Sequence, residues 1–155
     1  MKYINLFFMV FSLEVIAESS EERCLNFVGV GNNFQIAHEN SDCVSAAKLG
    51  SGSAMYSIGL GYGFAGKHNL EKAYYILAAA EEVPAAYLAL GNIYRESDMD
   101  QAIAWYVRFA NTKSEGYGYG AYMLSGIYQK LEQPEKASYW LSVCIESSMG
   151  ADCVK

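Results

Sequence analysis

The sequence is poor in the residues that catalysis and nucleic-acid binding require. Its 155 residues include only two histidines, and 11 Lys and Arg residues against 17 Asp and Glu residues give a formal net charge of −6. Nucleic-acid binding usually needs clustered Lys and Arg, and no such cluster is present. We therefore expect no nucleic-acid partner.

Candidate catalytic groups are equally few. The histidines are His38, beside Glu39, and His68, in an expected turn, and no serine or cysteine nucleophile has a base at a recognisable spacing. The GYGFAG segment from Gly61 to Gly66 matches the letters of the dinucleotide fingerprint, but that fingerprint needs a preceding strand, whereas this segment continues a helical pattern. The sequence predicts no enzyme and no cofactor.

The sequence also lacks a run of about 20 apolar residues, which a membrane-spanning helix needs. Residues 1–17 are instead typical of a secretory signal peptide, with Lys2 before an apolar run over residues 6–13 that Glu14 interrupts. We expect a periplasmic or secreted protein without a stable membrane span. Residues 18–33 would form its N-terminal extension.

Four cysteines remain after cleavage, namely Cys24, Cys43, Cys144 and Cys153. An even number of cysteines in an exported chain predicts two disulfides, with three possible pairings. Proximity along the chain favours Cys24 with Cys43 and Cys144 with Cys153. A zinc site made from all four is the alternative, but no CxxC pair is present and the two couples stand about a hundred residues apart. We therefore expect no metal site.

What the sequence does have is 52% hydrophobic residues, enough for the core of one domain, arranged in a pattern that recurs three times. Each copy predicts two amphipathic helices joined by a short turn. In its first helix, four core positions stand at offsets of 0, 4, 5 and 8, on one helical face. They are Ala54, Ile58, Gly59 and Tyr62, then Ala86, Leu90, Gly91 and Tyr94, and then Gly120, Leu124, Ser125 and Tyr128.

The second helix of each copy has an apolar stripe of its own. Its expected buried positions are Ala73, Ile76, Leu77 and Ala80, then Ala102, Trp105, Tyr106, Phe109 and Ala110, and then Ala137, Trp140, Leu141 and Cys144. Asp98 followed by Gln101 predicts a helix start, because each side chain can satisfy an unpaired backbone amide. Pro84 and Pro134 stand at expected helix starts, where a missing amide hydrogen costs nothing.

The segments around these copies are less regular. A helix is expected from Phe34 to Leu49, with Gly50 as its left-handed cap. The charged residues from Glu18 to Arg23 and the turn from Gly29 to Asn33 are expected to bury little. The GYGYG segment from Gly116 to Gly120 predicts a flexible junction before the third copy.

These residues resemble the Sel-1-like repeat family, relatives of the tetratricopeptide repeats. The family motif is alanine, three residues, leucine-glycine, two residues, tyrosine, a variable turn, and then lysine-alanine, two residues, tryptophan-tyrosine, two residues, alanine. The copy that carries it most fully has Ala86, Leu90, Gly91, Tyr94, Ala102, Trp105 and Tyr106, and the flanking copies contribute Lys72-Ala73 and Lys136-Ala137. The departures are Gln101 for lysine, Phe109 for the closing alanine, Ser125 for glycine, and a junction lengthened by Lys113 to Gly118.

The resemblance implies an all-α fold, an α/α solenoid of antiparallel helix hairpins over residues 34–155. It would contain about three Sel-1-like repeats and a degenerate N-terminal half-repeat from Phe34 to Leu49. The repeats would cover residues 51–82, 83–115 and 116–149, with a truncated cap over residues 150–155. The four cysteines are similar to those of the exported, cysteine-rich branch of the family, in which disulfides link consecutive helices.

The resemblance also indicates where a partner would bind, since the first helices of such a solenoid line its concave face. Aligned non-core positions and their neighbours on that face are Tyr56, Leu60, Phe64, Leu88, Asn92, Arg95, Tyr119 and Tyr122, with Lys130 further along. For Leu60 and Leu88, packing against the adjacent repeat is the alternative, whereas Tyr119 and Tyr122 are expected to be exposed. Thirteen tyrosines favour protein recognition, because a polar-tipped aromatic side chain suits an interface.

The expected function is that of a non-catalytic protein–protein interaction module. It would bind, and modulate or inhibit, a protein partner such as a secreted toxic effector or an envelope protein, as an immunity protein does. The alternatives are a cell-wall-related or β-lactam-hydrolysing enzyme of the cysteine-rich repeat type, and a structural spacer in an envelope complex.

Overall fold

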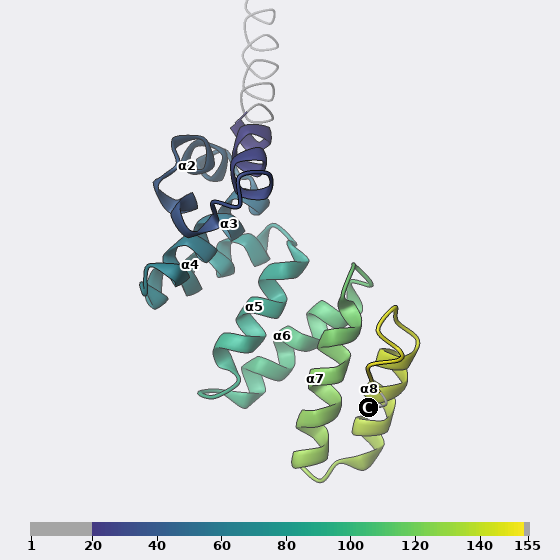
Figure 1. Cartoon of the computed structure of the whole chain (residues 1–155). Coiled ribbons are helices and arrows are strands. Elements are labelled where there is room, and N and C mark those ends of the chain that lie inside the picture. The colour runs from purple at the N-terminus through teal and green to yellow at the C-terminus, as the bar shows by residue number, and fades with distance from the viewer. Residues whose placement is uncertain (1–19, 154–155) are drawn as a thin grey trace, which may run out of the picture. The chain divides into compact units, whose positions relative to one another are not determined.

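The computed structural model describes residues 20–153, and every regular element within them is helical, with no strand (Figure 1). The predicted signal peptide lies outside these residues. Contacts between residues divide the chain into an N-terminal unit that ends at Val83 and a C-terminal unit that begins at Pro84. The all-α prediction is confirmed.

The N-terminal unit consists of a helix over residues 20–29, the 3₁₀ helix η1 (Phe34–Glu39), and the helices α2 (Ser41–Lys48), α3 (Gly52–Phe64) and α4 (His68–Ala80). Helices α3 and α4 pack against each other as a pair, and η1 and α2 pack on α3. The core of this unit includes the buried residues Cys24, Ala37, Cys43, Ala46, Ala54 and Ile58.

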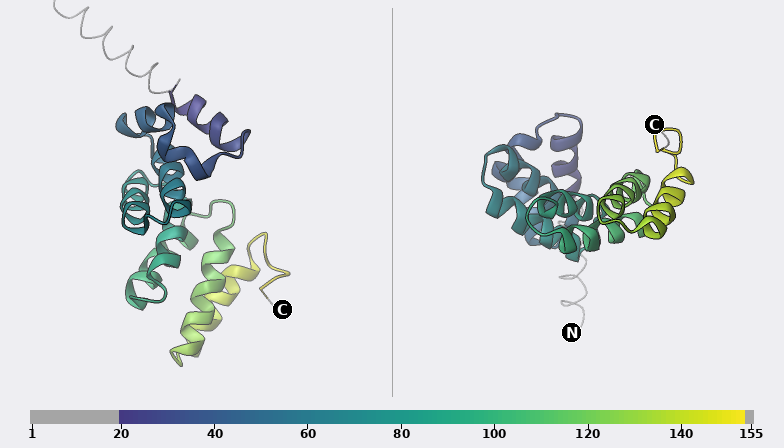
Figure 2. Two further views of the ribbon diagram at one scale, coloured as in Figure 1. Left: turned by 60° about the vertical axis from the view of Figure 1, so that its left-hand side comes forward. Right: turned by 90° about the horizontal axis from the view of Figure 1, so that it is seen from below.

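The C-terminal unit consists of α5 (Pro84–Tyr94), α6 (Met99–Asn111), α7 (Tyr117–Lys130) and α8 (Pro134–Ile145). Each helix packs on the next one along the chain, and Figure 2 shows α7 and α8 as an antiparallel pair. Both prolines occupy the first position of a helix, as predicted. The carboxylate of Asp98 accepts a hydrogen bond from the backbone amide of Gln101 at 3.1 Å, which confirms the predicted start of α6.

The first three of the four aligned core positions are buried in all three hairpins. They are Ala54, Ile58 and Gly59 on α3, Ala86, Leu90 and Gly91 on α5, and Gly120, Leu124 and Ser125 on α7. The glycines allow an aromatic ring of the paired helix to lie against the backbone. A Cβ added to Gly59 would be 2.7 Å from the ring of Tyr75, and one added to Gly91 would be 2.6 Å from the ring of Tyr106. The recurring small residue is therefore a packing requirement.

The predicted apolar stripe of α4 is wrong. Ile76 and Leu77 are 44% and 48% exposed, and Ala73 and Ala80 are exposed too. The buried residues are Tyr75, Ala78 and Ala79 instead. The contact between Tyr75 and Gly59 sets this register, because it turns the face that carries the ring towards α3. The same spacing holds in the other second helices, at Tyr106, Phe109 and Ala110, and at Trp140, Val143 and Cys144.

The predicted helix from Phe34 to Leu49 is broken into η1 and α2 at Asn40. The side chain of Asn40 accepts hydrogen bonds from the backbone amides of Asp42 and Cys43, both at 3.0 Å, and its backbone is extended. It therefore starts a new helix. At the other end, the prediction for Gly50 is confirmed, since its φ of 97° lies in the left-handed region.

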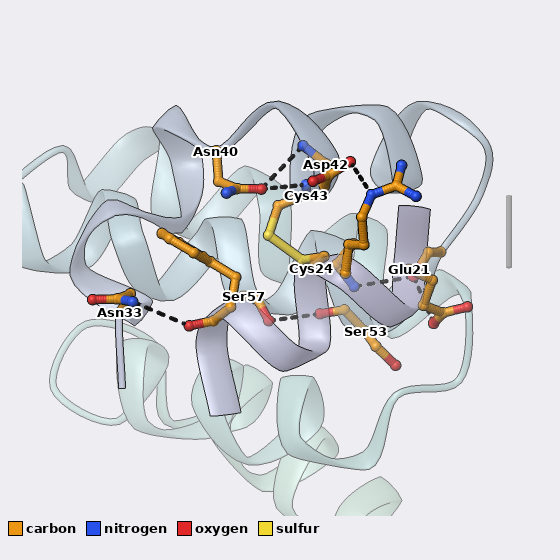
Figure 3. The surroundings of a disulfide bond; sticks show 12 residues. Glu21, Cys24, Asn33, Asn40, Asp42, Cys43, Ser53 and Ser57 are labelled. Carbon is orange, nitrogen blue, oxygen red and sulfur yellow. Dashed lines mark hydrogen bonds and ion pairs between the residues drawn. A yellow bond between two sulfur atoms is a disulfide. The ribbon is translucent and has the colours of Figure 1, made fainter. Parts of the chain in front are cut away.

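The predicted lead-in is helical from residue 20 onwards, but its charged residues bury little, as predicted, because Glu22 and Arg23 are exposed. Residues 20–29 are helical, and Cys24 is fully buried. A disulfide joins Cys24 to Cys43, and Asp42 accepts a hydrogen bond from Arg23 at 2.8 Å (Figure 3). Ser51, the N-cap of α3, donates to a Glu21 carboxylate oxygen at 2.7 Å. The covalent bond and the polar contacts together fix this helix to the unit.

The GYGYG junction is also more ordered than predicted, because α7 begins at Tyr117 rather than Gly120. Gly118 and Gly120 are buried. A Cβ on Gly118 would overlap the hydroxyl of Ser147, and one on Gly120 would lie 2.8 Å from the ring of Phe109. These glycines serve close packing, whereas Gly116, with a φ of 77°, makes the turn before the helix.

The second disulfide joins Cys144 of α8 to Cys153, so both pairs are those that proximity along the chain favoured. None of the four cysteines is free. Within residues 20–153, no helix has the length and apolar character to cross a membrane, and no three His, Cys, Asp or Glu side chains are grouped as metal ligands.

Candidate functional site

One candidate site is a cavity of about 520 Å³ in the C-terminal unit. We call it the C-terminal groove. It extends from the end of α5 and the start of α6 across α7 to α8 and the second disulfide. Its lining residues are Arg95, Glu96, Met99, Tyr122, Met123, Ser125, Gly126, Ile127, Gln129, Lys130, Leu141 and Cys153.

A second cavity of about 220 Å³ shares two of these residues, Tyr122 and Cys153, and is also lined by Tyr119, Met149 and Asp152. Tyr119 and Tyr122 are 37% and 48% exposed, which confirms the predicted exposure of both. Large, semi-rigid side chains of this kind commonly supply most of the binding energy of an interface. The two tyrosines therefore present exposed aromatic surface in this second cavity.

Arg95 is held in place at the end of α5. Its Nε donates to a carboxylate oxygen of Glu96 at 3.2 Å, and its side chain remains 41% exposed. Burial raises the pKa of Tyr106, and the charge of Arg95 and a hydrogen bond from its side chain act in the opposite direction. The hydroxyl of Tyr106 itself donates to Oδ1 of Asn92 at 2.7 Å. Asn92, predicted to contact a partner, thus accepts a hydrogen bond from a buried residue of the paired helix.

The other predicted site residues do not line this groove. Leu88 is partly buried and packs against the core of the C-terminal unit. Tyr56, Leu60 and Phe64 lie on α3 in the N-terminal unit. Leu60 is half-buried, and so is Tyr56, whose ring centroid is 5.4 Å from that of Tyr75 and whose pKa burial raises.

Phe64 is 61% exposed and stacks on Phe34 with ring centroids 6.3 Å apart. The sequence interpretation missed the apolar part of the groove, which consists of Met99, Met123, Ile127 and Leu141. The unbranched thioether of methionine adapts its shape to a partner, so Met99 beside the helix cap Asp98 is a signal that could have been used.

The two histidines lie on different elements of the N-terminal unit, His38 on η1 and His68 on α4. His38 has a side chain that is only 9% exposed, its ring centroid lies 4.7 Å from that of Tyr62, and its Nδ1 has no hydrogen-bond partner among the described residues. Gly61 lies against this nitrogen, which gives a packing reason for one glycine of the GYGFAG segment. His68, at the start of α4, contacts a carboxylate oxygen of Glu71 at 2.9 Å.

Comparisons of the chain with protein-family models, with curated proteins and with solved structures found no match.

Proposed function

We propose that this chain is an exported, non-catalytic module that binds a partner protein through the C-terminal groove. The observation that carries the proposal is the position of Tyr119 and Tyr122, two exposed tyrosines beside a groove with an oriented arginine, Arg95, and adaptable methionines. Interface cores are enriched in aromatic residues, Met and Arg. The same combination is found here in one unit of the chain.

The two disulfides support the exported location, because disulfides form and persist in oxidising compartments such as the periplasm and the extracellular space. The signal-peptide pattern of residues 1–17 points the same way. We place the mature chain in the periplasm or outside the cell.

We further propose that the three hairpins, α3–α4, α5–α6 and α7–α8, are Sel-1-like repeats of one solenoid. The support is the triplet of core positions buried in each copy, together with the equivalent contacts of Gly59 with Tyr75 and of Gly91 with Tyr106. Hairpin repeats of 32 and 34 residues fall in the range of such solenoids. In this arrangement the chain acts as a recognition scaffold.

The role that suits such a module is inhibition of its partner. A small, acidic chain with a preformed groove can occlude a functional surface of another protein without chemistry of its own. We therefore propose an immunity-type role, in which the partner is a toxic effector or an envelope protein and the chain blocks or modulates it.

Capture of the partner under oxidising conditions, followed by its identification, tests this function. Tyr119→Ala combined with Tyr122→Ala should abolish capture and leave helical circular dichroism unchanged. Tyr139→Ala is the matched control, since Tyr139 is 59% exposed on α8 and does not line the groove. Equal capture by the unaltered chain, the double variant and Tyr139→Ala would exclude the groove as the binding site. Hydrolysis of cell-wall or β-lactam substrates, lost when His38 and His68 are both replaced by alanine, would contradict the non-catalytic role.

A further inference from the structure

The charges of the C-terminal groove differ from those of the chain as a whole. The chain has a formal net charge of −6, but the groove is lined by two cations, Arg95 and Lys130, and one acidic residue, Glu96. A carboxylate oxygen of Glu96 is already engaged by Arg95. Asp152, in the adjoining cavity, also interacts within the chain. The groove is therefore locally cationic on an acidic protein.

Arg95 is pre-organised to bind an anion. A guanidinium has five N–H donors, and here Nε is used by Glu96. The remaining donors belong to a side chain that is 41% exposed and lines the groove. Because the guanidinium presents its donors in a rigid planar fork, less conformational entropy is lost for each hydrogen bond that a carboxylate forms with it.

Lys130 provides the second cation from a different helix, since it is the last residue of α7 and is exposed, with no ion pair among the described residues. Met99, 37% exposed, and Tyr122, 48% exposed, line the same groove, together with Met123. A ligand that follows the groove thus meets cationic and apolar groups in the same cavity.

We propose that the C-terminal groove selects a partner segment in which an acidic side chain stands beside a large aliphatic or aromatic one. Arg95 and Lys130 bind the carboxylate, and Tyr122 with the methionines packs on the apolar side chain. This inference rests on the proposed function and adds the chemistry of the partner to it. Charge complementarity of this kind contributes to specificity and to the association rate.

Fluorescently labelled peptides, capped at both ends, test the proposal against the oxidised full chain. The first peptide contains two Asp residues flanking a Leu-Phe pair, the second has Asn in place of Asp, and the third has Lys. The Asp peptide should bind most tightly and the Lys peptide least, with binding of the Asp peptide weakened by added salt. Equal affinity for the Asp and Asn peptides would overturn the proposal. So would tighter binding of the Asn peptide once its C-terminus is left uncapped, which would assign the cations to a chain-terminal carboxylate.

Charge-neutralising variants locate the effect. Arg95→Gln and Lys130→Gln should each weaken binding of the Asp peptide about fivefold, the expected size for a partly exposed ion pair. Arg108→Gln and Lys136→Gln are matched controls, because they remove the same charges from the same unit outside the groove lining. The alternative is that Arg95 and Lys130 only stabilise the C-terminal ends of their helices. In that case the two variants would lower thermal stability but bind the Asp peptide as tightly as the control variants do, and the proposal would fail.

The two proposals fail in different ways. A captured partner that is lost from the Tyr119 and Tyr122 double variant, but retained by Arg95→Gln and Lys130→Gln, would overturn the acidic-segment inference and leave the binding function standing. A partner retained by all of these variants would overturn both.

Discussion

The ring of Tyr106 lies directly on the backbone of Gly91, where an added Cβ would be 2.6 Å from Cε1. Tyr106 is fully buried, and its hydroxyl donates to Asn92, one residue after the glycine. One tyrosine on α6 thereby contacts α5 twice, with its ring on Gly91 and with its hydroxyl on the side chain of Asn92.

Gly91→Ala should destabilise the chain. Overpacking typically costs about 1–3 kcal/mol, which exceeds the gain of up to about 1 kcal/mol from replacing a helical glycine. Gly126→Ala is the matched control on α7, because nothing lies within 4 Å of its added Cβ, and it should stabilise the chain by about 0.5–1 kcal/mol. Denaturant unfolding measures both free energies, and a neutral or stabilising Gly91→Ala would contradict the described contact.

Removal of the second disulfide should affect both stability and binding. Cys144→Ser with Cys153→Ser opens a loop with a sequence separation of 9, which should lower the free energy of unfolding by about 2–3 kcal/mol in the chain-entropy model. Because Cys153 lines the groove, affinity for the Asp peptide should fall as well. The measurements are denaturant unfolding and peptide titration of the oxidised proteins.

The matched control for that variant is Cys24→Ser with Cys43→Ser, which opens a loop with a separation of 19 in the N-terminal unit. It should cost about 3 kcal/mol of stability in the same model and leave peptide affinity unchanged. Equal loss of peptide affinity in the two variants would show that the second disulfide has no specific role in the groove.

The elements that the sequence predicted well are those in which a local pattern and the tertiary contact agree. The first helices belong here, because their small residues both mark the motif and face a ring, as Gly91 does. In the second helix of the first hairpin, the buried face was predicted wrongly. The Lys72-Ala73 pair matches the motif, but the contact of Tyr75 with Gly59 determines which face is buried. The break at Asn40 was missed for a similar reason. The apolar pattern continues through this residue, but its side chain caps a new helix.

The candidate site was predicted only in part. Exposure of Tyr119 and Tyr122 follows from their positions between the core residues of α7, so periodicity was enough. The hydrogen bond that Asn92 accepts could not be predicted, because it depends on the position of the Tyr106 hydroxyl on the other helix of the hairpin. The apolar lining comes from three helices, α6, α7 and α8, and no sequence period relates Met99 to Leu141.

Alkaline pH should destabilise the fold through its buried tyrosines. Burial raises the pKa of Tyr75 most strongly, with further contributions from Tyr56 and Glu71, and burial also raises the pKa of Tyr56. Below pH 10, near the ordinary pKa, these phenols are protonated in both states, so their contribution is fully present. Above it the unfolded chain loses protons first, and the free energy of unfolding decreases as pH rises.

Denaturant unfolding over a pH series checks this. Tyr75→Phe should reduce the decrease above about pH 10, whereas Tyr139→Phe, at an exposed ring, serves as the control. A pH dependence that Tyr75→Phe leaves unchanged would assign the loss of stability to other groups.

Site-specific photo-crosslinking tests the central claim most directly. A photoreactive phenylalanine replaces Tyr122 in one exported, oxidised protein and Tyr139 in another, and each is irradiated in the cells that produce it. Binding through the C-terminal groove predicts one discrete protein adduct from position 122 and none from position 139. An adduct from position 139 alone would contradict the account and place the partner on α8 outside the groove.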